Sequence, residues 1–244
     1  MEMQRLDKLL SGTGKWSRRE VKLLVKQGRV LAGGTPAPSP ETKYDPETAV
    51  LTVDGEPVVL SRYTWVMLNK PAGVLSATED GRGKTVLDLL PTELQRLELF
   101  PVGRLDKDTE GLLLLTNDGK TAHRLLSPKY HVDKVYYARA AGRLEEADRQ
   151  AFEAGITLED GLVCRPAGLE ILSAGETSEC LVTLREGKFH QVKRMLAFRG
   201  KPVLYLKRLS MGKLTLDAAL KPGCFRLLTE GERQMLQNGE SGIG

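Results

Sequence analysis

The hydrophobic and polar positions of residues 1–60 predict a small module of two short helices followed by strands. Leucines at positions 6, 9 and 10 lie at helical spacing and give a first short helix one apolar face. Four prolines between residues 35 and 47 exclude a helix there. Residues 49–53 then form a short strand, so we place a domain boundary near residue 60.

The second helix of this module is predicted to be positively charged along one face. Ser17 and Glu20 have the spacing of a capping box, which marks the start of a helix. Arg18, Lys22 and Lys26 recur every four residues and form what we call the basic ridge. A row of positively charged side chains suits binding to a nucleic-acid phosphate backbone, because each cation that contacts a phosphate releases counterions condensed on the nucleic acid. An ordinary solvated helix face is the alternative. The positions predicted to face the interior are Val21, Leu24 and Val25.

From residue 61 onward, strands, turns and short helices follow one another without regular alternation. This pattern predicts an α+β domain at residues 61–240, built on a mixed, mostly antiparallel sheet flanked by helices. Strands are expected at 63–70, 74–78, 112–116, 134–141 and 180–184, and helices at 84–91, 145–156 and after residue 188.

The segment GRLDKDTEGLLLLTND, residues 103–118, joins a charged loop to an apolar run. The residues that match the first half of a calcium-binding EF-hand loop are Asp106, Asp108, Glu110 and Gly111. Asn117 stands where that loop needs a bidentate Glu, so the match fails. The segment instead predicts a loop leading into a buried strand, closed by a turn at 117–119. A carboxylate at the mouth of a buried strand is either functional or an ordinary loop charge.

Composition restricts the class of protein. The 244 residues are 41% hydrophobic and 28% charged, as in a soluble globular protein, and no apolar run approaches ~18 residues. No secretory signal or nucleotide-binding glycine loop is present. The three cysteines, like the three histidines, lie far apart. We therefore expect a cytoplasmic protein with no metal site, no disulfide framework and no cofactor.

The N-terminal module resembles the S4 RNA-binding domain. The similarity rests on the sequence SRRE at 17–20, which opens the second helix, and on GRV at 28–30, which enters a strand. One departure is Ala-Gly-Gly at 32–34, where the family often has Val-Asn-Gly. The residues expected to bind RNA are Arg5, Lys8, Ser17, Arg18, Arg19, Lys22, Lys26 and Arg29.

The second domain resembles the pseudouridine synthases of the RsuA group. The segments that carry the resemblance are LNKPAGVLSAT, FPVGRLDKDTEGLLLLTNDG, HVDKVYYA and EGKFHQVKRM, in this order. The resemblance implies a catalytic domain with a central cleft. It also implies a uridine of folded ribosomal RNA as substrate and no cofactor, since the isomerisation neither adds nor removes atoms.

The resemblance also assigns roles within the predicted site. It makes Asp106 the catalytic carboxylate, Tyr136 the ring on which the extruded uracil stacks, and Lys193 the cation that keeps Asp106 ionised. Arg104 would hold a phosphate or fill the place of the flipped base. Without the resemblance, Tyr136 would be an ordinary core ring and Lys193 part of a solvated helix face. Asp108 is expected to fix the loop or to be solvated.

Two alternatives remain open at this point. Sister enzymes that act on large-subunit ribosomal RNA share these motifs. Some of them carry a long basic C-terminal tail, which this sequence does not show, so we expect small-subunit ribosomal RNA as the partner. A non-catalytic RNA chaperone of the S4 type would have no use for a carboxylate facing phosphates. We expect a monomer that does not bind membranes.

Overall fold

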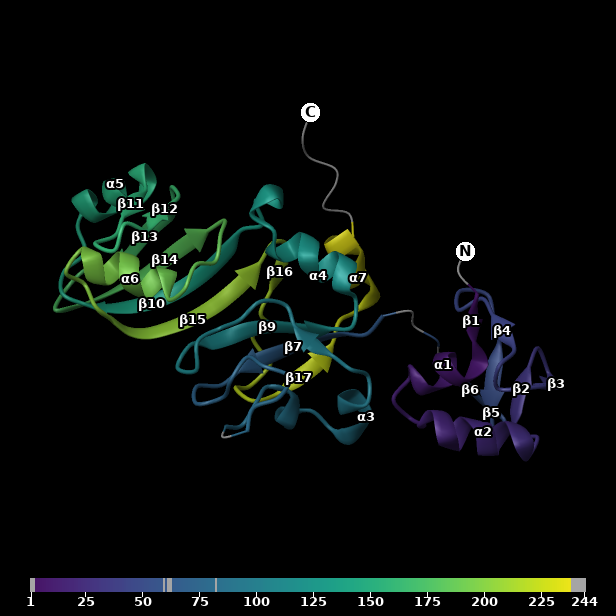
Figure 1. Cartoon of the computed structure of the whole chain (residues 1–244). Helices are drawn as coiled ribbons and strands as arrows, with labels where there is room; N and C mark the ends of the chain where they lie inside the picture. Colours follow the sequence, from purple (N-terminus) through teal and green to yellow (C-terminus); the bar gives the residue numbers. More distant parts are fainter. Residues whose placement is uncertain (1–2, 59, 61–62, 82, 238–244) are drawn as a thin grey trace. The chain divides into compact units, whose positions relative to one another are not determined.

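The computed structural model divides into two compact units, which are described separately (Figure 1). The first unit comprises Met1–Thr64 and Leu90–Phe100, and the second comprises Trp65–Leu89 and Pro101–Gly244. The residues that the structure describes are 3–58, 60, 63–81 and 83–237. The domain boundary expected near residue 60 adjoins residues 59, 61 and 62, which lie outside the described residues, and it stays a prediction.

The first unit contains the two predicted helices packed on small antiparallel sheets. Ser17 Oγ accepts from the Glu20 amide (3.3 Å), and Glu20 Oε2 accepts from the Ser17 amide (2.6 Å), so the capping box is confirmed. The helices are α1 (Leu6–Ser11), α2 (Arg18–Lys26) and α3 (Thr92–Gln95). The strands are β1 (Gln4–Arg5), β2 (Val30–Ala32), β3 (Thr35–Pro36), β4 (Lys43–Tyr44), β5 (Leu51–Val53) and β6 (Glu56–Val58). Its buried core includes Leu6, Leu10, Val21, Val30, Leu51 and Val53.

The second unit is built on one large sheet with the strand order β13-β14-β10-β15-β9-β7-β17, to which β8 and β16 add at the sides. Its strands include β7 (Trp65–Lys70), β8 (Phe100–Pro101), β9 (Glu110–Thr116), β10 (Lys134–Ala141), β13 (Gly168–Ser173), β14 (Thr177–Leu184), β15 (Val203–Met211), β16 (Leu214–Thr215) and β17 (Phe225–Leu227). Apart from the β9–β15 pair, the pairs given along this order are antiparallel. This confirms the predicted α+β class with a mostly antiparallel mixed sheet.

Helices and a small hairpin complete the second unit. In Figure 1, α5 and α6 lie beside the half of the sheet that contains β10, β13 and β14, and α4 and α7 lie near β16. The remaining elements are η1 (Leu87–Leu89), α4 (Gly119–Leu126), η2 (Pro128–Tyr130), α5 (Glu146–Ala154), β11 (Ile156–Thr157), β12 (Val163–Cys164), α6 (Gln191–Phe198) and α7 (Glu230–Gln237). Within the described ranges, no helix has the length and apolar content that crossing a membrane requires.

The two halves of the large sheet meet at the short parallel junction of β9 and β15. Gly111 pairs with Arg208 there, and Glu110 pairs with Lys207. Gly111 has a φ of 100°, and a Cβ atom at this position would lie 2.2 Å from the Arg208 carbonyl oxygen. Glycine is therefore required for the strands to meet. Glu110 Oε2 also accepts a hydrogen bond from the Tyr205 hydroxyl (2.8 Å), which fixes the start of β9.

Three local predictions were wrong or incomplete. The strand expected at 74–78 is only an isolated bridge between Leu75 and Thr85, so its hydrogen bonding depends on a distant segment and not on the local pattern. The helix expected at 84–91 is the short 3₁₀ helix η1. The turn expected at 117–119 is the start of α4, where the Asp118 side chain accepts from the Thr121 amide (3.1 Å). Asp is favoured both in turns and at helix N-caps, so the sequence pattern fits either.

Candidate active site

Asp106 lies in the loop that leads into β9, and three polar side chains surround its carboxylate. Lys193 Nζ is 3.0 Å from Oδ2, which confirms the ion pair expected between these two residues. His190 Nε2 is 3.5 Å from Oδ1, and the Thr109 hydroxyl donates to Oδ2 (3.4 Å). The Asp106 side chain is 26% exposed, so an incoming ligand can still reach it.

Lys193 is shared between two carboxylates. Its Nζ is 2.5 Å from Asp108 Oδ1 as well as 3.0 Å from Asp106 Oδ2. Burial opposes the charge of Lys193, but hydrogen bonds to Asp108 and Asp106 outweigh it and raise the Lys193 pKa. The hydrogen bond from Lys193 in turn lowers the pKa of Asp108. Asp108 was expected to fix the loop or to be solvated, and its side chain is 75% exposed. It also pairs with Lys193, so Asp108 and Asp106 compete for the same cation.

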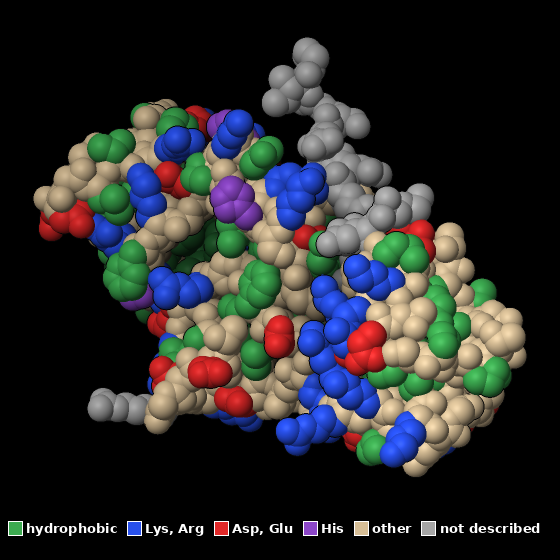
Figure 2. All heavy atoms as spheres, turned by 45° about the vertical axis from the view of Figure 1, so that its right-hand side comes forward, with side chains coloured by type: hydrophobic (Ala, Val, Ile, Leu, Met, Phe, Trp, Pro, Cys, Tyr) green, Lys and Arg blue, Asp and Glu red, His purple; other side chains and the backbone are tan. Residues whose placement is uncertain are grey.

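A cavity of about 70 Å³ opens beside Asp106. Tyr136 on β10 forms part of its wall and is only 9% exposed, while Arg104 at the rim is exposed. Lys193, which pairs with Asp106, is not one of the residues that line the cavity. The face in Figure 2 has a hollow with hydrophobic side chains at its base and basic side chains along its rim. The cavity is lined by Arg104, Leu105, Asp106, Thr109, Tyr136, Leu184, Gly187, Lys188, His190, Gln191, Val192 and Leu206.

Lys70, which was not predicted from the sequence as part of the site, holds the loop that carries Asp106. Lys70 ends the buried strand β7 and is fully buried. Its Nζ donates to the carbonyl oxygens of Pro71 (3.0 Å), Asp106 (3.1 Å), Lys107 (3.2 Å) and Thr109 (2.9 Å). Burial lowers the Lys70 pKa to about 8, so the ammonium form still predominates at pH 7. A lysine that ends a strand opening with four apolar residues, Trp65 to Leu68, was the available signal, since a buried lysine needs partners.

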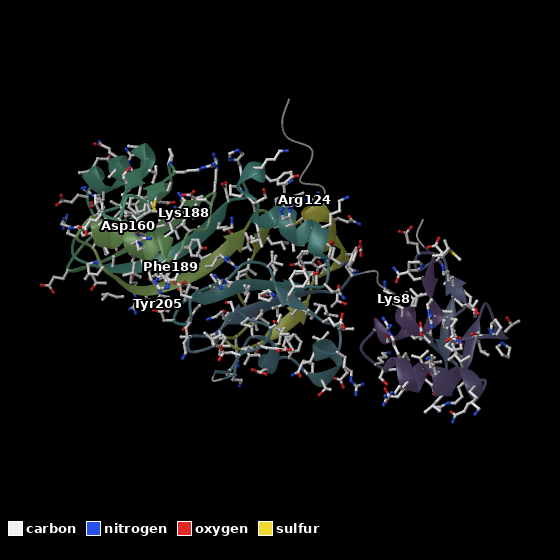
Figure 3. The ribbon with its side chains drawn as sticks, viewed as in Figure 1. Lys8, Arg124, Asp160, Lys188, Phe189 and Tyr205 are labelled. Atoms are coloured by element: carbon white, nitrogen blue, oxygen red, sulfur yellow. The ribbon has the colours of Figure 1, made fainter. Side chains whose placement is uncertain are left out.

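The predicted RNA-binding residues divide into two groups in the first unit. Arg5 pairs with Asp7 (2.9 Å) and Glu41 (3.2 Å), and Arg29 forms two 2.6 Å hydrogen bonds with Asp54. These two arginines are therefore partly neutralised, and Ser17 is occupied in the capping box. The exposed cations left for phosphate contacts are Lys8 (labelled in Figure 3), Arg18, Arg19, Lys22 and Lys26.

The part of the chain that the structure describes contains no group of three or more His, Cys, Asp or Glu residues arranged to hold a metal ion. Asp106, Tyr136 and Arg104 bring a carboxylate, an aromatic ring and a cation to one cavity, and Lys193 adds a second cation beside Asp106. Such a set of side chains can stabilise an electron-poor carbon, move a proton and hold a planar base.

Replacing Lys193 with Met is expected to shift the acid limb of the activity profile to higher pH. Lys193 Nζ lies 3.0 Å from the Asp106 carboxylate, and a cation so close favours the charged form of an acid. Activity measured from pH 5 to 9 tests this expectation. Arg194→Met is the matched control, because Arg194 follows in the same helix but pairs with Asp160 (2.5 Å). An unchanged acid limb in the Lys193→Met protein would contradict the role assigned to the ion pair.

Two family models match the chain. The model described as RNA pseudouridylate synthase matches residues 64–198, and the S4 domain model matches residues 4–50. The first match contains the loop of Asp106, the strand of Tyr136 and the whole of α6. The second contains the basic ridge. Both families are the ones that the sequence motifs resemble.

The chain is also similar to several proteins over most of its length. It is 51% identical to "Uncharacterized RNA pseudouridine synthase YtzG" of Bacillus subtilis, over 95% of this chain and 98% of the relative. It is 39% identical to "Ribosomal small subunit pseudouridine synthase A" of Vibrio cholerae, over 93% of this chain and 97% of the relative. A solved structure titled "Crystal structure of pseudouridylate synthase" aligns over 96% of this chain with 34% identity and a TM-score of 0.67.

Proposed function

Because the chain belongs to the RNA pseudouridylate synthase family, we propose that it converts a uridine of ribosomal RNA to pseudouridine with Asp106 as the catalytic carboxylate. The observation that carries this proposal is the position of Asp106. Its carboxylate borders the cavity and is 26% exposed, with Lys193 paired to Oδ2 and His190 beside Oδ1. A carboxylate with only a structural role would not need to face a cavity.

The reaction breaks the bond between ribose C1′ and N1 of uracil, turns the base and joins C1′ to C5. The proton on C5 is released and N1 gains one, so the atoms balance. The Asp106 carboxylate either attacks C1′ or removes a proton from the ribose. Tyr136 keeps the freed uracil stacked in the cavity while it turns, and Arg104 holds the backbone beside the extruded nucleotide.

The proposed substrate is small-subunit ribosomal RNA. The support comes from relatives named "Ribosomal small subunit pseudouridine synthase A", such as the Vibrio cholerae protein. Large-subunit ribosomal RNA is the second candidate, because the sequence motifs of the two groups of enzymes are shared.

Tritium release separates these candidates. Small- and large-subunit ribosomal RNA transcripts containing uridine labelled with tritium at C5 are incubated separately with the purified protein. We expect release from the small-subunit transcript, followed by mapping of a defined position. Release from the large-subunit transcript alone would move the proposal to that RNA. No release from either transcript would favour the non-catalytic RNA chaperone of the S4 type.

Removing the basic ridge is expected to weaken RNA binding without changing its sequence preference. Arg18, Lys22 and Lys26 are exposed, and phosphate contacts position a protein without reading bases. Replacing all three with Gln should reduce the slope of log affinity against log salt by about two to three units. Filter binding between low and physiological salt measures the slope.

The control for the ridge is Arg149→Gln in α5. Arg149 is an exposed helical arginine whose charge is already paired with Glu146 and Glu153, so its loss should leave the salt slope nearly unchanged. The ridge would have no role in RNA binding if the triple variant kept the wild-type slope.

A further inference from the structure

The loop before α6 presents an aromatic ring to solvent beside Asp106. The Phe189 side chain is 71% exposed, the highest value among the exposed large hydrophobic residues that the structure describes. Figure 3 labels Phe189 in the segment that leads into α6. A single exposed hydrophobic residue is ordinary on a protein surface, so exposure alone would not indicate a role. The surroundings of this ring are what distinguish it.

Phe189 contacts His190, which in turn lies beside Asp106. The two rings are stacked, with centroids 3.7 Å apart and an interplanar angle of 19°, and His190 Nε2 is 3.5 Å from Asp106 Oδ1. Lys188 and His190 both line the cavity, whereas Phe189 between them does not. The ring of Phe189 therefore lies next to the cavity but outside it.

The backbone of this loop is fixed on both sides of Phe189. Gln191, which is 4% exposed, accepts from the Lys188 amide (3.0 Å) and donates to Glu186 (2.7 Å). His190 has the left-handed backbone conformation (φ 51°, ψ 32°), which is unfavourable for a residue other than glycine. Such strain persists where the surrounding contacts determine the conformation. A ring held in this way loses little conformational freedom when it stacks on a partner.

We propose that Phe189 is a stacking site for an unpaired nucleobase of the substrate RNA that flanks the uridine entering the cavity. The proposal rests on the proposed function. Every base offers a face for stacking on an aromatic ring, and the exposed guanidinium of Arg104, which also lines the cavity, suits a neighbouring phosphate. The base on Phe189 is a neighbour of the target, because the ring lies outside the cavity that would receive the target.

The physical purpose of this site is to lower the cost of extruding the target. Flipping a nucleotide removes the stacking that its neighbours had with it. A fixed ring that takes the place of the missing base restores one of these contacts. Phe189 should therefore act on RNA affinity, whereas Asp106 acts on the chemical step.

Substitution of Phe189 tests the site. We expect Phe189→Ala to lower RNA affinity and kcat/KM by roughly tenfold, and Phe189→Trp to keep both close to wild type, since stacking survives. The matched control is Phe198→Ala at the other end of α6, where the ring is 45% exposed and does not line the cavity. Its values should stay at the wild-type level, and thermal unfolding checks that all variants are folded.

A double-mutant cycle, in which a protein variant is combined with an altered RNA, identifies the stacked base. A short RNA spanning the mapped uridine is prepared with an abasic nucleotide on either side of the target. If Phe189 stacks on that neighbour, the abasic RNA and Phe189→Ala each lower affinity, but their combination lowers it no further. Fully additive losses at both positions, or a Phe189→Ala protein that behaves like Phe198→Ala, would overturn the inference.

Tritium release by the wild-type protein separates this inference from the function on which it rests. Release by wild type together with additive losses would overturn the stacking site alone. No release from either ribosomal RNA would overturn the proposed function and the stacking site with it.

Discussion

Replacing Asp106 with Asn is expected to reduce pseudouridine formation by at least about a thousandfold while leaving RNA affinity within about tenfold. The substitution keeps the shape of the side chain but removes the charge that the proposed chemistry needs. In the proposed function, affinity rests on phosphate contacts made elsewhere, and the loss of a negative charge near phosphates can even strengthen them. Tritium release from C5-labelled ribosomal RNA and filter binding with the same RNA measure the two quantities.

Asp108→Asn is the matched control for this prediction. Asp108 lies two residues further along the same loop, shares Lys193 and is 75% exposed. Its replacement leaves Lys193 to Asp106 alone, so the variant should stay active. Substantial tritium release by the Asp106→Asn protein would show that another group does the chemistry. A loss of thermal stability with turnover retained would make Asp106 a structural residue.

Replacing Lys70 with Met is expected to destabilise the protein by about 2–6 kcal/mol and to disorder the loop of Asp106. The methionine fills much of the same volume but donates no hydrogen bond, and the carbonyl oxygens of Pro71 and Thr109 lose their Lys70 donor inside the protein. Each unsatisfied buried carbonyl costs about 1–3 kcal/mol. Urea unfolding followed by circular dichroism measures the change in the free energy of unfolding.

Activity gives a second measurement for Lys70. Below the unfolding midpoint, the Lys70→Met protein should still have reduced kcat, because the Asp106 carbonyl is one of the four oxygens that the ammonium holds. Lys107→Met is the control, since Lys107 is an exposed lysine of the same loop and its side chain should be dispensable. A Lys70→Met protein as stable and active as the control would show that the loop is held by its other contacts.

The elements that the sequence predicted well are those determined by local pattern. The capping box and the apolar spacing of α2, the apolar run of β9 and the alternation of β10 each reflect the period of one element. The long motif around Asp106 indicated the family. The resemblance to that family predicted the ion pair between Asp106 and Lys193, which the structure contains. These features need only a few neighbouring residues, or one resemblance, to be predicted.

Contacts between distant segments decided the rest. Lys70 reaches the loop of Asp106 because β7 lies beside β9 in the sheet, and no pattern within either strand encodes that neighbourhood. Glycine is required at position 111 because β15 pairs with β9 there in parallel and places the Arg208 backbone against it. The pairing of Arg29 with Asp54 likewise depends on β2 lying beside β5. Local pattern in the sequence was enough to predict elements such as α2, β9 and β10, and the motif around Asp106 was enough to indicate the family. The tertiary structure decided which charges neutralise one another and what holds the motif in place, because hydrogen bonds and ion pairs depend on distances that only the order of strands in the sheet sets.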